Sequence, residues 1–262
     1  MDRIVLAMGC AALIALPAIA ADDSRDGRAL AESVVRAYGG RAALAGVRSY
    51  RMEGRVFSAM RHEDASVIRV FQRPGRFKSL VEYDDGAEAR VVDGDAVWHN
   101  APGGPLEPAD EPMRQAAILQ AARAGLPWIL AAHAGSARLL PDEPSPVPVK
   151  PPSDGVEVEL RALEVPLGGG LLLRAWIDRA GLVRVSQGIM TRGAMATHFE
   201  TLYEDFTTVS GVTFAFHERT WAAGTETGET TVRRVIVNPE LRPDEFRPPA
   251  AADSAGTGSA GS

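Results

Sequence analysis

The sequence predicts a mainly β protein of the α+β class, in which one large antiparallel sheet of about eleven strands is covered by a few helices. Three observations support this class. Short segments with a hydrophobic period of two follow one another closely and are separated by turn residues. Segments of helical composition occur in only two places, near the start of the chain and in its middle. The regular alternation of strands and helices that is typical of a parallel sheet is missing.

The first predicted elements are a helix and a series of strands. Asp22 to Ser24 can cap a helix whose apolar residues recur at helical spacing and which ends at Gly39-Gly40. From Val47 the period changes to two, which predicts a strand that continues to Val56. Four further strands are expected after it, separated by sequences typical of turns: 65–72, 76–83, 87–93 and 96–100.

The middle of the chain predicts two short helices, Pro112–Arg123 and Pro127–His133, with Gly125 between them. They are rich in apolar residues, so we expect them to lie on the sheet. Six of the twelve residues in the segment 141–152 are proline, which favours an extended loop within one domain over a linker between two domains. Six strands are expected after this loop, at 155–165, 170–178, 182–190, 194–206, 212–221 and 230–238.

The domain organisation follows from these elements. We expect a single domain over residues 21–249 and a disordered tail over residues 250–262, which contains little that could be buried. A sheet of about eleven strands must curl, and its concave apolar face needs a cover, which the amphipathic helices can supply.

The first twenty residues have the layout of a secretory signal peptide. A short charged segment, 1–3, precedes an apolar run, 4–20, that ends in small residues suited to cleavage near Ala20. The sequence therefore predicts export to the periplasm. Two alternatives remain open: an uncleaved membrane anchor, for which the run is short and contains Pro17, and a lipidated N-terminus at Cys10.

Composition and charge exclude several classes of function. Cleavage would remove Cys10, the single cysteine of the 262 residues, so the mature chain would have no catalytic cysteine, thiolate metal site or disulfide. The 28 basic and 34 acidic residues give a net charge of −6, which argues against a nucleic-acid partner and against an anionic membrane surface. A chain of this length buries about 70 to 75% of its unfolded surface, so its stability requires no cofactor.

Four segments together resemble the LolA/LolB-like periplasmic carriers and related outer-membrane lipoprotein-sorting-like proteins. The segment AESVVRAYGGRAALAGVRSYRMEG, at 31–54, resembles their opening helix, Gly-Gly stop and first strand. Their paired strands around a Trp-Ile-Asp turn are similar to LLLRAWIDRAGLVRVSQ, at 171–187. The late strand pair and closing segment are similar to YEDFTTVSGVTF, at 203–214, and VRRVIVNPELRPDEFRPP, at 232–249. The Pro-rich segment and the C-terminal tail depart from the well-studied carriers.

The resemblance implies a half-open antiparallel β-barrel of about eleven strands with a helical lid, and a cavity between lid and barrel that holds acyl chains or other hydrophobic ligands. It therefore implies a carrier of a lipid, a lipoprotein acyl chain or another hydrophobic ligand, which acts without chemistry. An inner- or outer-membrane protein or a lipoprotein could be its partner. The alternative is a non-catalytic envelope-stress sensor or regulatory interaction module that uses the same fold.

The residues offer little support for an enzyme or a metal site, and no cofactor is expected. Five histidines lie on separate predicted elements, and none forms a spaced pair of metal ligands: His62, His99, His133, His198 and His217. His217 and Glu218 are adjacent on a strand, so their side chains should point to opposite faces. No GxSxG motif is present, and Ser210-Gly211 is placed where a hairpin turn is expected.

The candidate ligand site is a set of apolar residues expected to point toward the concave side of the sheet. A strongly curved sheet with few helices leaves space there, and an alkyl chain gains about 0.8 kcal/mol for each methylene that it buries. The inward direction of each side chain rests on strand alternation alone. The candidates on strands and lid are Tyr50, Met52, Val56, Phe71, Phe77, Trp98, Trp128, Ile129, Trp176, Phe199 and Phe214.

Overall fold

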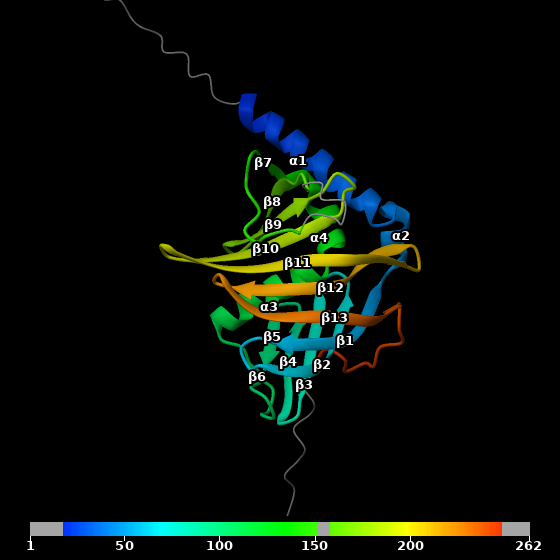
Figure 1. Cartoon of the computed structure of the whole chain (residues 1–262), viewed down its shortest axis with the longest axis vertical. Helices are drawn as coiled ribbons and strands as arrows, with labels where there is room; N and C mark the ends of the chain where they lie inside the picture. The colour runs from blue at the N-terminus through cyan, green and yellow to red at the C-terminus, as the bar shows by residue number, and fades with distance from the viewer. Residues whose placement is uncertain (1–17, 151–157, 248–262) are drawn as a thin grey trace, which may run out of the picture.

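Thirteen antiparallel strands form one continuous curved sheet in the computed structural model, which describes residues 18–150 and 158–247 (Figure 1). The strand order is β6-β5-β4-β3-β2-β1-β13-β12-β11-β10-β9-β8-β7. The chain therefore starts in the middle of the sheet, runs outward to the edge at β6, and returns from the opposite edge at β7. Its first and last strands meet in the middle, where β1 pairs with β13.

The first half of the sheet is a meander of hairpins. A three-residue loop, 73–75, joins β2 to β3, and two-residue loops join β3 to β4 and β4 to β5. Each loop consists of residues typical of turns, such as Asp84-Asp85 between Tyr83 and Gly86. The strands of this half are β1 (Ser49–Ser58), β2 (Glu63–Gln72), β3 (Arg76–Tyr83), β4 (Gly86–Asp93), β5 (Ala96–His99) and β6 (Glu107–Pro108).

The second half returns from the other edge in the same style. Ser210 and Gly211 have positive φ values of 51° and 82° and form the expected tight turn of one hairpin. The strands of this half are β7 (Arg138–Leu140), β8 (Arg161–Gly168), β9 (Leu171–Ile177), β10 (Val183–Arg192), β11 (Met195–Val209), β12 (Val212–Ala222) and β13 (Thr225–Val237).

Helices open the described chain and connect the two edges of the sheet. α1 (Ala18–Ala37) and α2 (Gly40–Gly46) precede the first strand. α3 (Glu111–Ala124), α4 (Leu126–His133) and the short 3₁₀ helix η1 (Ala134–Ser136) lie between β6 and β7. Because those strands are opposite edges, their connection must cross the sheet, and it does so as helices over one face (Figure 1).

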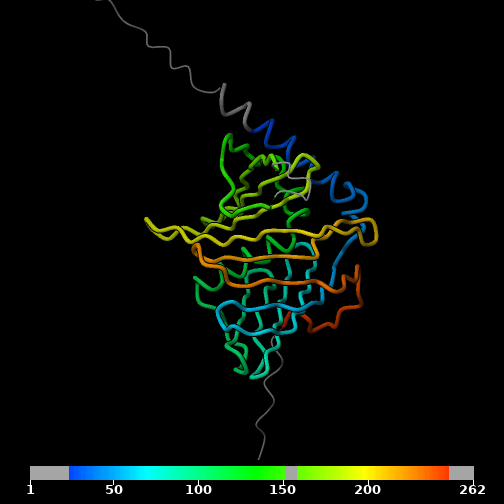
Figure 2. Tube along the Cα trace, viewed as in Figure 1, coloured from blue at the N-terminus to red at the C-terminus, as the bar shows by residue number. Residues whose placement is uncertain are grey.

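The first and last strands, β1 and β13, pair in the middle of the sheet, at what we call the central seam. Figure 2 shows the first strand beside the last, although they are far apart in the sequence. Asn238, which follows β13, accepts hydrogen bonds at Oδ1 from the backbone N–H groups of Arg48 (2.7 Å) and Ser49 (3.2 Å). Its Nδ2 donates to the carbonyl oxygen of Gly46 (2.9 Å). This one side chain therefore joins the last strand to the turn between α2 and β1.

The two faces of the sheet have separate apolar clusters. The inner face, which the helices cover, carries the main cluster, and this includes Val34 and Leu130 from the helices and Phe77 from β3. The outer face carries two smaller clusters. One lies under the Pro-rich segment and includes Val147, and the other lies under the C-terminal segment and includes Phe246.

Each of the eleven expected strands has a counterpart, and β6, β7 and α2 are additional. β8 begins at Arg161, which pairs with Ile177, the last residue of β9, and residues 158–160 are not part of the strand. The expected start at residue 155 lies outside the described residues. β13 begins at Thr225, earlier than the expected residue 230. The expected signal peptide falls largely on residues 1–17, and the expected tail is 250–262; both lie outside the described residues, as do the last two residues of the Pro-rich segment.

Candidate functional site

Helix α3 crosses the inner face of the sheet and leaves a hollow on each side. We call the first the inner hollow; it has a volume of about 330 Å3 and lies between α3 and strands of both halves of the sheet, with Val56, Val81 and Phe199 in its wall. The second, the outer hollow, has a volume of about 880 Å3 and lies between α3, α4 and the turns that include Pro74 and Gly168. A smaller space of about 90 Å3 adjoins the inner hollow at Arg69 and Arg123.

The sequence of α3 explains why there is space on both sides. Ala116, Gln120 and Arg123 recur at helical spacing and line the inner hollow. Ile118 and Ala122 belong to the side that lines the outer hollow. The alanines on these two sides have side chains too short to fill the space between helix and sheet.

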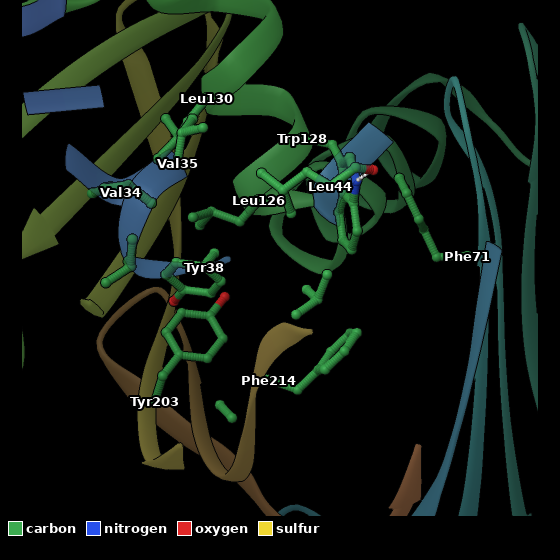
Figure 3. Close-up of a cluster of buried hydrophobic side chains, with 14 of the residues drawn as sticks. Val34, Val35, Tyr38, Leu44, Phe71, Leu126, Trp128, Leu130, Tyr203 and Phe214 are labelled. Carbon is green, nitrogen blue, oxygen red and sulfur yellow. Dashed lines mark hydrogen bonds between the residues drawn. The ribbon is translucent and has the colours of Figure 1, made fainter. Parts of the chain in front are cut away.

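An aromatic cluster holds the junction of α3 and α4 against the sheet (Figure 3). Tyr50 stacks on Phe71 and on Trp128, with ring centroids 5.6 and 5.9 Å apart, and Phe214 meets it edge-on at 5.3 Å. The polar atoms of the cluster are also bonded. Trp128 Nε1 donates to the carbonyl oxygen of Leu44 (2.9 Å), and Tyr50 Oη donates to that of Ala124 (2.8 Å). The lid helices are therefore anchored by rings and hydrogen bonds together.

Charged residues also lie in this interior. Arg69 on β2 forms an ion pair with Glu218 on β12, and its Nη2 lies 3.3 Å from Thr230 Oγ1. Burial opposes the charge of Arg69, but Glu218 outweighs this effect and raises the pKa of the guanidinium. The Nε atom of Arg69 is buried and has no hydrogen-bond partner among the described residues. Burial raises the pKa of the nearby Tyr203 to about 12, so its hydroxyl is neutral.

Arg123 brings a second guanidinium from the last turn of α3. Its Nη1 donates to the carbonyl oxygen of Phe199 (2.7 Å), and its guanidinium carbon lies 5.7 Å from the centroid of the Phe199 ring. Burial lowers the pKa of Arg123, although Tyr203 and Glu200 act in the opposite direction. A third arginine, Arg90, binds Glu88 (2.8 Å) and reaches Gln120 Oε1 (3.3 Å). The inner hollow therefore combines apolar walls with fixed charges.

The structure brings nine of the eleven candidate residues to the inner face. Each of them lines one of the three spaces described above, and that they bind a ligand remains a prediction. These nine are Tyr50, Met52, Val56, Phe71, Phe77, Trp128, Ile129, Phe199 and Phe214.

Trp98 and Trp176 lie on the outer face, contrary to the expected direction. Trp98 packs with Phe246, while its neighbour Val97 belongs to the inner cluster. Trp176 packs with Val147, and its Nε1 donates to the carbonyl oxygen of Glu143 in the Pro-rich segment (3.1 Å). The C-terminal and Pro-rich segments thus supply apolar cover on the outer face, which a strand pattern alone does not reveal.

Sequence reasoning missed Arg69, Arg123 and Glu218. A charged residue on an amphipathic strand or helix is usually solvated, so the residue type gave no signal of their inward position. Strand alternation offered one indirect signal. His217 and Glu218 do point to opposite faces: His217 bonds Glu204 (3.1 Å) and Glu229 (2.7 Å) on the outer side, while Glu218 lines the interior.

The histidines do not combine into a metal site in the part of the chain that the structure describes. Over residues 18–150 and 158–247, no three His, Cys, Asp or Glu side chains are arranged to hold a metal ion. None of the helices described there is long and apolar enough to cross a membrane.

Two solved structures are similar over most of this architecture. A LolA superfamily protein from Nitrosomonas europaea matches with a TM-score of 0.53 and 12% sequence identity, over 84% of this chain and 96% of that one. The chain has a LolA-like fold. A DUF1329 family protein from Desulfovibrio piger also matches with a TM-score of 0.53 and 12% identity, over 86% of this chain and 97% of that one.

The LolA-like fold confirms the expected half-open barrel with a helical lid, here with thirteen strands rather than eleven. No known family model matches the sequence, and no curated protein sequence matches it. At 12% identity, the likeness rests on the arrangement of strands and helices.

Proposed function

We propose that the chain is a periplasmic carrier that binds a lipid, a lipoprotein acyl chain or another hydrophobic ligand between the curved sheet and the lid helices. The observation that carries this proposal is the unfilled space on both sides of α3, about 330 Å3 within the curve of the sheet and about 880 Å3 outside the helix. Protein interiors are normally close-packed, and ligand pockets span roughly 300–1,000 Å3.

The chemistry of the walls supports a ligand with an alkyl portion. Val56, Val67, Val81 and Phe199 contribute apolar side chains to the inner hollow, and Ile118 and Ile129 do so in the outer hollow. Each methylene that leaves water for such a wall contributes about 0.8 kcal/mol to binding. The signal-peptide layout of the first twenty residues supports a periplasmic location.

Co-purification tests this function directly. The full chain is expressed in a bacterium with a periplasm, purified from the periplasmic fraction without detergent, and examined by native mass spectrometry and organic extraction. A bound mass in the lipid range supports the carrier and identifies the class of cargo. A protein that carries no such mass, and whose tryptophan fluorescence does not respond to fatty acids or phospholipids, contradicts the proposal.

A matched pair of variants shows whether the ligand occupies the inner hollow. Ala116→Trp places an indole in the inner hollow, where Ala116 is half-buried. Ala132→Trp adds the same group at an exposed position of α4 and serves as control. We expect loss of the bound mass in the first variant only. Loss in both variants, or in neither, would place the ligand outside the inner hollow.

A further inference from the structure

The charges that line the inner hollow and the small adjoining space do not balance. Among the described residues of these walls there are three arginines and two glutamates. Arg69 is paired with Glu218 and Arg90 with Glu88. Arg123 is left without a carboxylate within 4.0 Å in the described part of the chain. The walls therefore hold one net positive charge.

Arg123 is placed to receive a further partner. It is in the last turn of α3 and lines both the inner hollow and the small space beside it. Its one hydrogen bond to a described residue uses Nη1 and the neutral carbonyl of Phe199, while a guanidinium has five N–H donors. A buried charge is costly unless it is paired and hydrogen-bonded. An anion in the hollow would supply both.

The surroundings of Arg123 fit an anion that is attached to an alkyl chain. Arg69, with its buried and unpartnered Nε, lines the same two spaces and offers a further N–H donor. From there the apolar wall continues through Val67 and Val81 to Met60, which is 76% exposed between β1 and β2. The hollow thus has a cationic interior and an apolar wall that reaches the protein surface.

We propose that the inner hollow binds an amphiphilic anion, with a carboxylate or phosphate head against Arg123 and an alkyl chain that runs along Val81 toward Met60. This inference rests on the proposed carrier function and specifies its ligand class. Arg123 then has two roles: its hydrogen bond to Phe199 joins the lid to the sheet, and its remaining donors bind the head group.

A comparison of ligands that differ only in the head group tests the proposal. Binding of dodecanoate, dodecyl phosphate and dodecanol to the full chain is measured at neutral pH by tryptophan fluorescence, below the micelle concentration of each. Dodecanoate is ionised at this pH and dodecanol is uncharged. We expect at least one of the two anions to bind more tightly than the alcohol, and the stronger of the two identifies the head group.

Arg123→Gln should weaken binding of the preferred anion roughly ten- to hundredfold, because a charge-assisted hydrogen bond is lost, and should leave dodecanol within about twofold. Arg123→Lys keeps the charge and should restore part of the preference. Arg36→Gln is the matched control, because Arg36 is an exposed arginine in the last turn of α1 and lines none of the three spaces. Arg114→Gln tests the outer hollow, which Arg114 lines. Thermal unfolding of each variant shows whether it is folded.

The outcomes separate this inference from the proposed function. If the wild type binds anions and alcohol equally well and Arg123→Gln changes neither, the ligand class is wrong, but the carrier function stands. If Arg114→Gln removes the preference and Arg123→Gln does not, the inner hollow is not the anion site. If none of the three ligands binds, the carrier function itself is contradicted, together with the inference. Equal loss of anion and alcohol in a folded Arg123→Gln variant would show that Arg123 only holds the lid, which also overturns the inference.

Discussion

Glu218 neutralises the charge of Arg69 inside the curved sheet. The pair joins β12 to β2 across the interior, and the Glu218 side chain is only 9% exposed. We expect Glu218→Gln to lower the free energy of unfolding by about 3 kcal/mol, because it leaves the guanidinium buried without its partner. The measurement is equilibrium unfolding in urea.

The double variant Arg69→Met/Glu218→Leu gives the control. Replacing both charges by apolar side chains of similar size removes the cost of an unpaired charge, so the double variant should be more stable than Glu218→Gln alone. A double variant that is as unstable as the single one, or less stable, would contradict the view that burial of an unpaired arginine is the main cost.

His217 on the outer face makes stability depend on pH. Partial burial opposes its charge, but hydrogen bonds to Glu229 and Glu204 outweigh this effect and raise the pKa of the imidazole. The stabilisation is fully present below the unfolded pKa of about 6.5 and is lost as pH rises through the higher folded pKa.

His217→Gln should therefore lower the free energy of unfolding most in mildly acidic solution. The loss should become smaller as pH rises through the folded pKa. We expect at most about 1 kcal/mol, because Glu229 is half-exposed and solvent screens the pair. Urea unfolding of the wild type and the variant at several pH values measures the difference. A difference that grows with rising pH would refute this assignment.

Residue by residue, the sequence could predict most of the inner face. Tyr50 and Met52 alternate with polar neighbours, so only one face of their strand could be buried, and the structure buries it. Trp176 shares its strand face with Arg174, so alternation favours the outer side for it, but its size and apolar character suggested a buried inner position. The Pro-rich segment buries it on the outer face instead. The ion pair between Arg69 and Glu218 could not be predicted, because the two residues are 149 positions apart in the chain.

At the scale of elements, the junction between α3 and α4 depends on Gly125. A Cβ atom added there would lie 2.4 Å from Phe71 Cζ. Phe71 cannot move aside, because it is 2% exposed and stacks on Tyr50 and Trp128. Gly125→Ala should therefore lower the free energy of unfolding by about 1–3 kcal/mol through overpacking.

Gly135→Ala is the matched control for this junction. Gly135 lies in η1, and an added Cβ there meets nothing within 4 Å. We expect little change in its urea midpoint. Equal stability of the two variants would mean that the aromatic cluster can rearrange, and that the lid is held less tightly than the ring contacts indicate.

The elements themselves were predictable wherever the hydrophobic period and the turn residues indicated the same bounds. Strands such as β3 and β4 alternate and end in turn residues, so their bounds could be anticipated. The two edge strands escaped detection because β6 has two residues, one of them Pro108, and β7 has three, too few to show a period. The helix α2 has seven residues and begins at Gly40, inside the Gly-Gly pair that predicted the end of the first helix.

At the scale of the whole molecule, the pairing of β1 with β13 at the central seam joins the two halves of the sheet into one structure. β1 and β13 are the first and last strands, and their pairing carries a bulge at Glu53/Gly54. The main apolar cluster extends across both halves beneath the helices. A molecule joined in this way should unfold in one transition. When the seam opens, neither half of the sheet keeps the helices that cover its inner face.

Gly54 allows a direct test of that cooperativity. A Cβ added there would lie 2.4 Å from the carbonyl oxygen of Thr231, a backbone atom of β13 that cannot withdraw unless the seam opens. Gly54→Ala should lower the free energy of unfolding by about 3 kcal/mol and move the whole transition, with coincident circular dichroism and tryptophan fluorescence curves. Gly75→Ala, where an added Cβ meets nothing within 4 Å, should leave the transition in place. Two separate transitions in Gly54→Ala would instead show that the meanders fold independently, and the ligand hollow, whose walls come from both, would then form only after they dock.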